Sequence, residues 1–206
     1  MKDIYVYEGS NVLKNKLNIK EQKLLSDAEA DYVSMRLREL AVSPLRGNYN
    51  IQHFLQMHYY IFQDIYDWAG VPRRVNIEKS EPVLGGMSIE YSDLMDIPKD
   101  IRTCLSALED IDWKKYSVAE ATSKFSESLA YLWKIHPFRE GNTRTVITFM
   151  CQYADEKIRQ INRVLFEENS AYVRTALVAY NAYFQDGSNF QKKEYLYKIV
   201  EDALFK

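Results

Sequence analysis

Nine consecutive residues, His136–Arg144 (HPFREGNTR), bring together the side chains of a phosphate-handling site. His136 is the candidate proton acceptor, because an imidazole with an ordinary pKa of about 6.5 is largely neutral at neutral pH. Glu140 offers a hard carboxylate oxygen of the kind that Mg²⁺ takes when it also holds substrate phosphates. Arg144 adds a planar cation that can pair with two phosphate oxygens at once. These groups are typical of phosphoryl or nucleotidyl transfer, in which positioning and charge neutralisation do most of the catalysis.

The same segment predicts a backbone anion site. Pro137 and Gly141 end one helical pattern and permit a tight turn, and Asn142 is a good N-cap for the helix that follows. The first amides of a helix lack partners within it and carry a partial positive charge, so Gly141, Asn142 and Thr143 can hold phosphate oxygens. Each feature alone is common in proteins without this function, and a lone histidine at a helix end is usually structural. Their coincidence in one loop favours nucleotide chemistry.

The elements that position this loop follow from apolar residues at helical spacing along most of the chain. The expected helices run over about 20–40, 51–68, 92–109, 117–135, 143–157, 168–185 and 191–204. One stretch, Arg73–Ile89, alternates like a strand and turns at Pro82, which predicts a short β-hairpin. The chain has seven glycines, five prolines and no internal repeat or linker. We therefore expect a single all-α domain over residues 1–206, a compact bundle of about seven or more helices with one hairpin.

Composition excludes some classes of protein. The 206 residues have a net charge of −2, without the basic excess of most nucleic-acid-binding proteins, so no direct nucleic-acid binding is expected. No apolar run reaches the roughly 18 residues of a membrane span, and the N-terminus lacks the apolar core of a secretory signal. Cys104 and Cys151 form no CxxC pair, which fits a reducing compartment. We expect cytoplasmic residence, with export by a specialised route left open.

The loop His136–Arg144 resembles the signature of the Fic family (filamentation induced by cAMP), HPFx[D/E]GN[G/K]R. The likeness extends upstream: Val12–Leu17 (VLKNKL) is similar to the family's N-terminal vLkNklgi, and Phe62–Gly70 (FQDIYDWAG) resembles its helix end diYdWAG. His58 sits near a position that often carries histidine in the family. The resemblance covers a core of about residues 10–160.

This resemblance implies the Fic fold, in which the expected hairpin is the flap that aligns a target segment by strand-like pairing. It also implies a bacterial protein adenylyltransferase, which transfers AMP or another nucleoside monophosphate from an NTP to a Ser, Thr or Tyr hydroxyl of a target protein, with self-modification included. In that reaction His136 takes the proton of the attacking hydroxyl, and Glu140 holds Mg²⁺ at the phosphates of ATP. The amides of residues 141–143 and the Asn142 side chain hold phosphate oxygens, while Arg144 holds the β- or γ-phosphate.

Two positions depart from the family pattern. Thr143 stands where Gly accompanies nucleotidyl transfer and Lys marks a phosphotransferring branch. Ile147 replaces a second arginine, which puts the γ-phosphate contact in question. Nucleotidyl transfer is favoured. The alternatives are phosphotransfer from an NTP to a protein hydroxyl, and a weakly catalytic, toxin-like module that binds nucleotide.

Regulation is less defined by the sequence. Many Fic proteins are silenced by a helix bearing [S/T]xxxE[G/N], and no stretch here matches it fully. Glu201, in the C-terminal helices at about 168–204, is the candidate inhibitory acid, although Tyr197 and Asp202 replace its expected neighbours. The simpler interpretation of Glu201 is a solvated helix charge. Control by an antitoxin or by a homo-oligomer also stays open.

Overall fold

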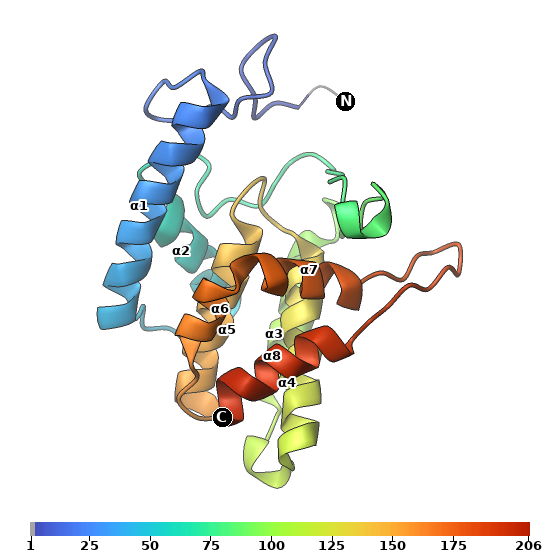
Figure 1. The fold of residues 1–206 in the computed structure, drawn as a ribbon. Coiled ribbons are helices and arrows are strands. Elements are labelled where there is room, and N and C mark those ends of the chain that lie inside the picture. The colour runs from blue at the N-terminus through green and yellow to red at the C-terminus, as the bar shows by residue number, and fades with distance from the viewer. Residues whose placement is uncertain (1–2) are drawn as a thin grey trace.

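The helical patterning of the sequence produces eight α-helices in the computed structural model, which describes residues 3–206 (Figure 1). They are α1 (Gln22–Val42), α2 (Ile51–Phe62), α3 (Ile97–Glu109), α4 (Val118–Ile135), α5 (Asn142–Lys157), α6 (Arg163–Glu168), α7 (Ser170–Tyr180) and α8 (Glu194–Phe205). Two short 3₁₀ turns, Pro82–Leu84 and Trp113–Lys115, complete the list. The all-α prediction is therefore confirmed. None of the helices within residues 3–206 is both long and apolar enough to cross a membrane.

Helix α4 forms the centre of the core, and its ends are set by local chemistry. It begins at a capping box, in which Ser117 and Glu120 each bond the other's backbone amide. Phe125, Leu129 and Trp133 on its apolar face are at most 1% exposed. The helix packs against α3, α5, α7 and α8. Its C-terminal end is therefore a rigid platform for the loop that leads into α5.

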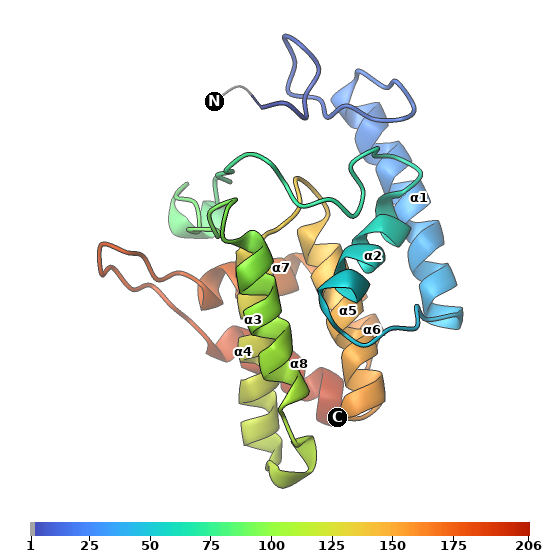
Figure 2. The ribbon, with the colours of Figure 1, turned by 180° about the vertical axis from the view of Figure 1, so that it is seen from behind.

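Figures 1 and 2 both show the connection between α4 and α5 at the same end of the molecule as the long segment between α2 and α3. The part of that segment from residue 73 to residue 92, here the covering segment, lies over the loop. Helix α1 flanks α2, and the two pack together. The loop is thus enclosed by parts of the chain far from it in sequence.

The hairpin expected over Arg73–Ile89 is wrong in detail, because the covering segment contains no paired strands. It runs extended and turns at Pro82–Leu84, with one bond of 3.1 Å from Glu81 N to Met87 O across the turn. The Arg73 guanidinium instead bonds backbone carbonyls of the segment that a ladder could have paired. Among the described residues, β-bridges occur only as isolated pairs at Val6–Leu13 and Tyr183–Asn189.

Three helix boundaries also differ from expectation. Helix α2 ends at Phe62 rather than near Trp68, because the chain turns back and Gly70 N donates to His58 Nδ1 (2.8 Å). The helix expected over 168–185 is shorter, α7 (Ser170–Tyr180), and a separate short helix, α6 (Arg163–Glu168), precedes it. Helix α3 begins at Ile97, with Pro98 in its first turn, rather than near residue 92.

Candidate functional site

His136 ends α4 in a backbone conformation that side chains rarely adopt. Its φ is 49° and its ψ 55°, the left-handed region, which costs a non-glycine residue about 1 kcal/mol. Arg73, which is 3% exposed, secures it through two bonds. Its side-chain Nε donates to His136 O (2.9 Å), and its backbone N donates to Pro137 O (2.7 Å).

The His136 imidazole is buried without a polar partner. The ring is stacked on Tyr91, with centroids 4.1 Å apart, and meets Trp133 edge-on at 5.4 Å. Neither ring nitrogen has a hydrogen-bond partner among residues 3–206. Burial, reinforced by the nearby cation of Lys79, holds the pKa of His136 well below its ordinary value. The ring is therefore neutral at neutral pH, with one nitrogen available to accept a proton.

The loop after His136 is held by interactions inside it and beneath it. Asn142 Oδ1 accepts from Phe138 N (2.8 Å), and Asn142 Nδ2 donates to Phe138 O (2.7 Å). Phe138 is fully buried and stacks on His58 with ring centroids 3.6 Å apart, so it anchors the loop in the core. The expected N-cap is wrong, because Gly141 caps α5 and Asn142 is its first helical residue. The Asn142 side chain ties the loop together instead.

His58 supports the loop from α2. Its Nδ1 accepts from Gly70, so its Nε2 carries the proton and donates to Glu140 O (3.1 Å). Burial lowers the pKa of His58 to about 3, so this bonding pattern persists at neutral pH. The sequence pattern indicated a histidine near this position, but the bond from His58 to the loop could not be predicted from the sequence.

Gly141 allows the loop to approach the core closely. Its φ is 80°, and a Cβ built there would lie 2.2 Å from Phe62 Cζ. The first backbone bond into α5 runs from Thr145 N to Gly141 O (3.0 Å). The amides of residues 142–144 precede that bond, and such amides have no partner within the helix. The helix start therefore presents the positive end of its dipole and free N–H groups, as an anion site requires.

Glu140 is a partly exposed carboxylate between cations. Its Oε1 accepts from Gly141 N (2.9 Å), and its Oε2 lies 3.7 Å from Lys79 Nζ. Burial alone would raise the pKa of Glu140, but Lys79, the Gly141 amide and Arg144 together hold it below its usual range. No group of three or more His, Cys, Asp or Glu side chains suited to a metal occurs among the described residues. A cation here would therefore be held by one protein carboxylate, that of Glu140, with non-protein ligands such as water completing its coordination.

The two departures from the expected motif have structural consequences. Thr143 Oγ1 accepts from Trp133 Nε1 (2.9 Å), so its side chain bonds the preceding helix. Ile147 lines an apolar cavity of about 250 Å³ between α1, α5 and the α6–α7 region. Arg144 lies over the Phe62 ring at 4.9 Å, and its NH2 donates to Glu29 on α1. Thr143 and Ile147 thus add no charge to the loop.

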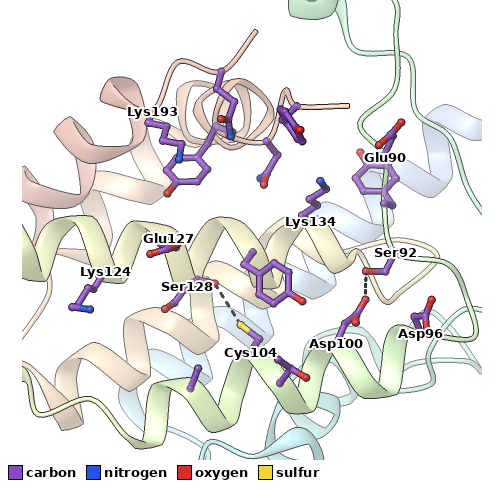
Figure 3. A pocket seen from close by; sticks show the side chains of 18 of the residues that line it. Glu90, Ser92, Asp96, Asp100, Cys104, Lys124, Glu127, Ser128, Lys134 and Lys193 are labelled. Atoms are coloured by element: carbon purple, nitrogen blue, oxygen red, sulfur yellow. Dashed lines mark hydrogen bonds between the residues drawn. The ribbon is translucent and has the colours of Figure 1, made fainter. Parts of the chain in front are cut away.

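Two other features lie apart from the loop. Glu201 pairs with Lys206 at 3.2 Å, near the C-terminus that Figure 1 shows away from the loop. A cavity of about 870 Å³ lies beside α3 and α4 (Figure 3). Its wall includes Tyr91, Asp100 and Lys134, but no residue from 136 to 144. In Figure 3, Ser92 donates to Asp100 (2.6 Å) within it.

Comparison with known proteins decides the family. The model described as the Fic/DOC family matches residues 48–154, which include the whole loop. The chain belongs to the Fic/DOC family. The probable protein adenylyltransferase y4lH of Sinorhizobium fredii is 32% identical over 155 residues, which cover 73% of this chain and 74% of that protein.

Other Fic/DOC relatives differ in length or in sequence. Protein adenylyltransferase VbhT of Bartonella schoenbuchensis is 30% identical over 159 residues, and the match spans 73% of this chain but only 32% of VbhT. The crystal structure of BepC, a VirB-translocated effector of Bartonella tribocorum with bound AMPPNP, superposes with a TM-score of 0.77. It shares 19% identity, and the match covers 97% of this chain and 95% of that one. This likeness confirms the Fic fold.

Four residues that surround the Fic/DOC loop were not identified from the sequence: Glu29, Arg73, Lys79 and Tyr91. They come from α1 and the covering segment, so only tertiary contacts bring them to the site. Lys79 lies within the strand-like stretch, and Tyr91 lies just after it. The pattern of this stretch does not indicate which side chains face the loop. Arg73 had a weak signal, as a charged residue in an alternating run.

Proposed function

We propose that this Fic/DOC chain is a protein adenylyltransferase that transfers AMP from ATP to a Ser, Thr or Tyr hydroxyl of a target protein. The observation that carries the proposal is the His136 imidazole, which is neutral, unpartnered and joined by a five-residue connection to the free amides of α5. This short connection supports a proton acceptor and an anion site acting in one reaction. The adenylyltransferase names of the relatives and the AMPPNP bound to BepC point the same way.

In the proposed reaction the target hydroxyl oxygen attacks the α-phosphorus of ATP. Its proton passes to the free nitrogen of His136, and the bond between the α-phosphorus and the α–β bridging oxygen breaks. Pyrophosphate leaves with that oxygen. The imidazole then returns its proton to solvent or to the leaving group. General-base catalysis of this kind contributes about 10²–10⁴ in rate.

The amides at the start of α5 and the Arg144 guanidinium would bind the phosphates. The Asn142 side chain has both polar atoms engaged with Phe138, so we assign phosphate contact at this position to the backbone N–H. Arg144 would take the β- and γ-oxygens, which lie furthest from the attacked phosphorus. Holding these groups in line is the main source of rate enhancement in such transfers.

Glu140 fits Mg²⁺ as a single protein ligand. Mg²⁺ is commonly held by one or two carboxylates plus substrate phosphates, and Lys79 Nζ lies 3.7 Å from Glu140 Oε2, beyond hydrogen-bond distance. When bound, the ion would neutralise charge on the phosphate oxygens. Lys79 would add a second positive charge at the same place.

Tyr91 covers the face of His136, so a target hydroxyl can reach the ring only after the covering segment moves. The 2% exposure of His136 therefore describes the closed resting arrangement. We propose that docking of the target displaces Tyr91. Target proteins in a bacterial cytoplasm are the first to test, and proteins outside the producing cell are the second, because BepC is a translocated effector.

Phosphotransfer is the alternative within enzymes, and Thr143 disfavours it. The phosphotransferring branch of the family carries lysine at this position, whereas the Thr143 hydroxyl is uncharged and accepts from Trp133. A nucleotide-binding module without catalysis remains the alternative from another class. The possible inhibitory Glu201 and control by an antitoxin or homo-oligomer stay predictions.

Intact-mass analysis of the chain and of added proteins after incubation with each NTP and Mg²⁺ tests the proposal. We expect one nucleoside monophosphate to be added per modified site, with ATP as donor. The His136→Gln variant should lose transfer but keep ATP affinity. His53→Gln is the matched control, because His53 is also buried, with an unpartnered Nε2, but lies away from the loop. Equal transfer by wild type and His136→Gln would contradict the proposal.

A further inference from the structure

Helix α1 contributes a partly buried carboxylate to the motif arginine. Arg144 NH2 donates to Glu29 Oε1 at 2.5 Å, across a separation of 115 residues. The Glu29 side chain is 14% exposed, against 34% for Arg144. The hydroxyl of Tyr66, which is 1% exposed, donates to the other oxygen, Oε2. Both oxygens of Glu29 are therefore engaged by residues from two other parts of the chain.

This arrangement holds one end of the guanidinium and leaves the rest available. A guanidinium has five N–H donors in a rigid fork. Arg144 contacts Glu29 and Glu140 through Nη2 alone, so neither carboxylate occupies Nε or Nη1. The Phe62 ring supports the guanidinium at 4.9 Å.

Another arginine of the same protein shows what full engagement looks like. Arg174 donates to Glu81 through both NH1 and NH2, at 2.6 and 2.8 Å. A carboxylate that neutralises an arginine completely adopts this two-pronged geometry. Glu29 contacts Arg144 through one oxygen and gives its second oxygen to Tyr66. The contact is therefore suited to orienting Arg144 rather than to occupying it.

We propose that Glu29 is the positioning residue for Arg144, and that with Tyr66 it holds the guanidinium ready for the outer phosphates of the nucleotide. The inference rests on the proposed function, which assigns the β- and γ-phosphates to Arg144. Glu29 lies outside residues 48–154, the part that matches the Fic/DOC model. Helix α1 is then a functional part of the nucleotide site.

The test compares the affinities of wild type and Glu29→Gln for ATP, ADP and AMP by titration calorimetry. Glutamine keeps the size of the side chain but removes the charge that orients Arg144. We expect ATP and ADP to bind about tenfold more weakly, the range of one charge-assisted hydrogen bond. AMP, which has no outer phosphates, should bind as it does to wild type. An equal loss for all three nucleotides would indicate a structural role only.

Glu39→Gln is the matched control. Glu39 also lies on α1 and also accepts from one arginine and one tyrosine, Arg36 and Tyr60, but it is away from the loop. We expect its nucleotide affinities to equal those of wild type. Should Glu29→Gln fold poorly, Tyr66→Phe supplies a milder change, with a smaller loss for ATP and none for AMP.

A double substitution tests whether Glu29 acts through Arg144. Adding Glu29→Gln to Arg144→Gln should change ATP affinity less than about twofold, since the group being positioned is already gone. Unchanged or tighter ATP binding by Glu29→Gln would overturn the inference, the latter because it would mean that Glu29 blocks Arg144. A wild-type chain that binds ATP but transfers no AMP would contradict the proposed function alone.

Discussion

Substituting Gly141 with alanine should distort the loop on which the proposed chemistry depends. At φ 80°, an alanine costs about 1–2 kcal/mol in backbone energy alone. Its Cβ would also lie 2.2 Å from Phe62 Cζ, where carbon atoms normally keep about 3.5–4.0 Å apart. The ring must therefore retreat, and forced repacking of this kind costs about 1–3 kcal/mol. We expect Gly141→Ala to lower the free energy of unfolding by about 2–5 kcal/mol.

Gly187→Ala separates the two contributions. Gly187 has a similar φ of 87°, but a Cβ there would meet nothing within 4 Å. Its alanine variant should therefore lose only the backbone contribution, about 1–2 kcal/mol. Urea unfolding at pH 7 gives both values. Equal losses in the two variants would refute the reasoning, because the contact with Phe62 would then carry no cost.

The same pair of variants also has a functional outcome. Phe62 lies beneath Arg144, so a displaced ring should move the guanidinium to which we assign the outer phosphates. We expect ATP affinity to fall in Gly141→Ala and to stay unchanged in Gly187→Ala. Adding Phe62→Leu to Gly141→Ala removes ring atoms from the contact and should recover part of the lost stability.

Three further predictions concern the groups around the loop. Because burial lowers the pKa of His58 from about 6.5 to about 3, its stabilising contribution is complete above pH 6.5 and is lost as pH falls toward 3. At about 1.4 kcal/mol per pH unit, wild type should lose about 2 kcal/mol more than His58→Gln between pH 6.5 and 5, as measured by urea unfolding. Lys79→Met should weaken ATP binding about 5- to 10-fold through the lost charge beside Glu140, and AMP transfer should fall as well; unchanged ATP affinity would remove Lys79 from the site. Arg73→Met leaves several buried carbonyls without donors and should cost at least about 3 kcal/mol, whereas the exposed Arg74→Met should change stability by less than about 0.5 kcal/mol.

The helices on either side of the motif loop could be predicted because their signals are local. Apolar spacing indicated helices over 117–135 and 143–157, and the structure has Val118–Ile135 and Asn142–Lys157. The loop itself was predicted from Pro137 and Gly141, which end the first helical pattern and permit a tight turn, although Gly141 caps the next helix in place of the expected Asn142. These features depend on residues a few positions apart, and sequence patterns report them well.

The covering segment shows what local patterns miss. Its alternation is typical of a hairpin, but the Arg73 guanidinium donates to two of its backbone carbonyls, and the segment forms no paired strands. The stack of Tyr91 on His136, and the contact of Glu29 with Arg144, span 45 and 115 residues respectively. Such contacts arise only when the tertiary fold brings the segments together. The sequence predicted the loop and the helices on either side of it, but not the residues that cover and position it.

Transfer of label from ATP labelled at either the α- or the γ-phosphorus tests the central claim most directly. Wild type and His136→Gln are compared at equal nucleotide occupancy, with the chain itself and a bacterial lysate as acceptors. We predict that wild type labels protein from the α-phosphorus only, and that His136→Gln labels no protein. Labelling from the γ-phosphorus, or undiminished α-labelling by His136→Gln, would contradict it.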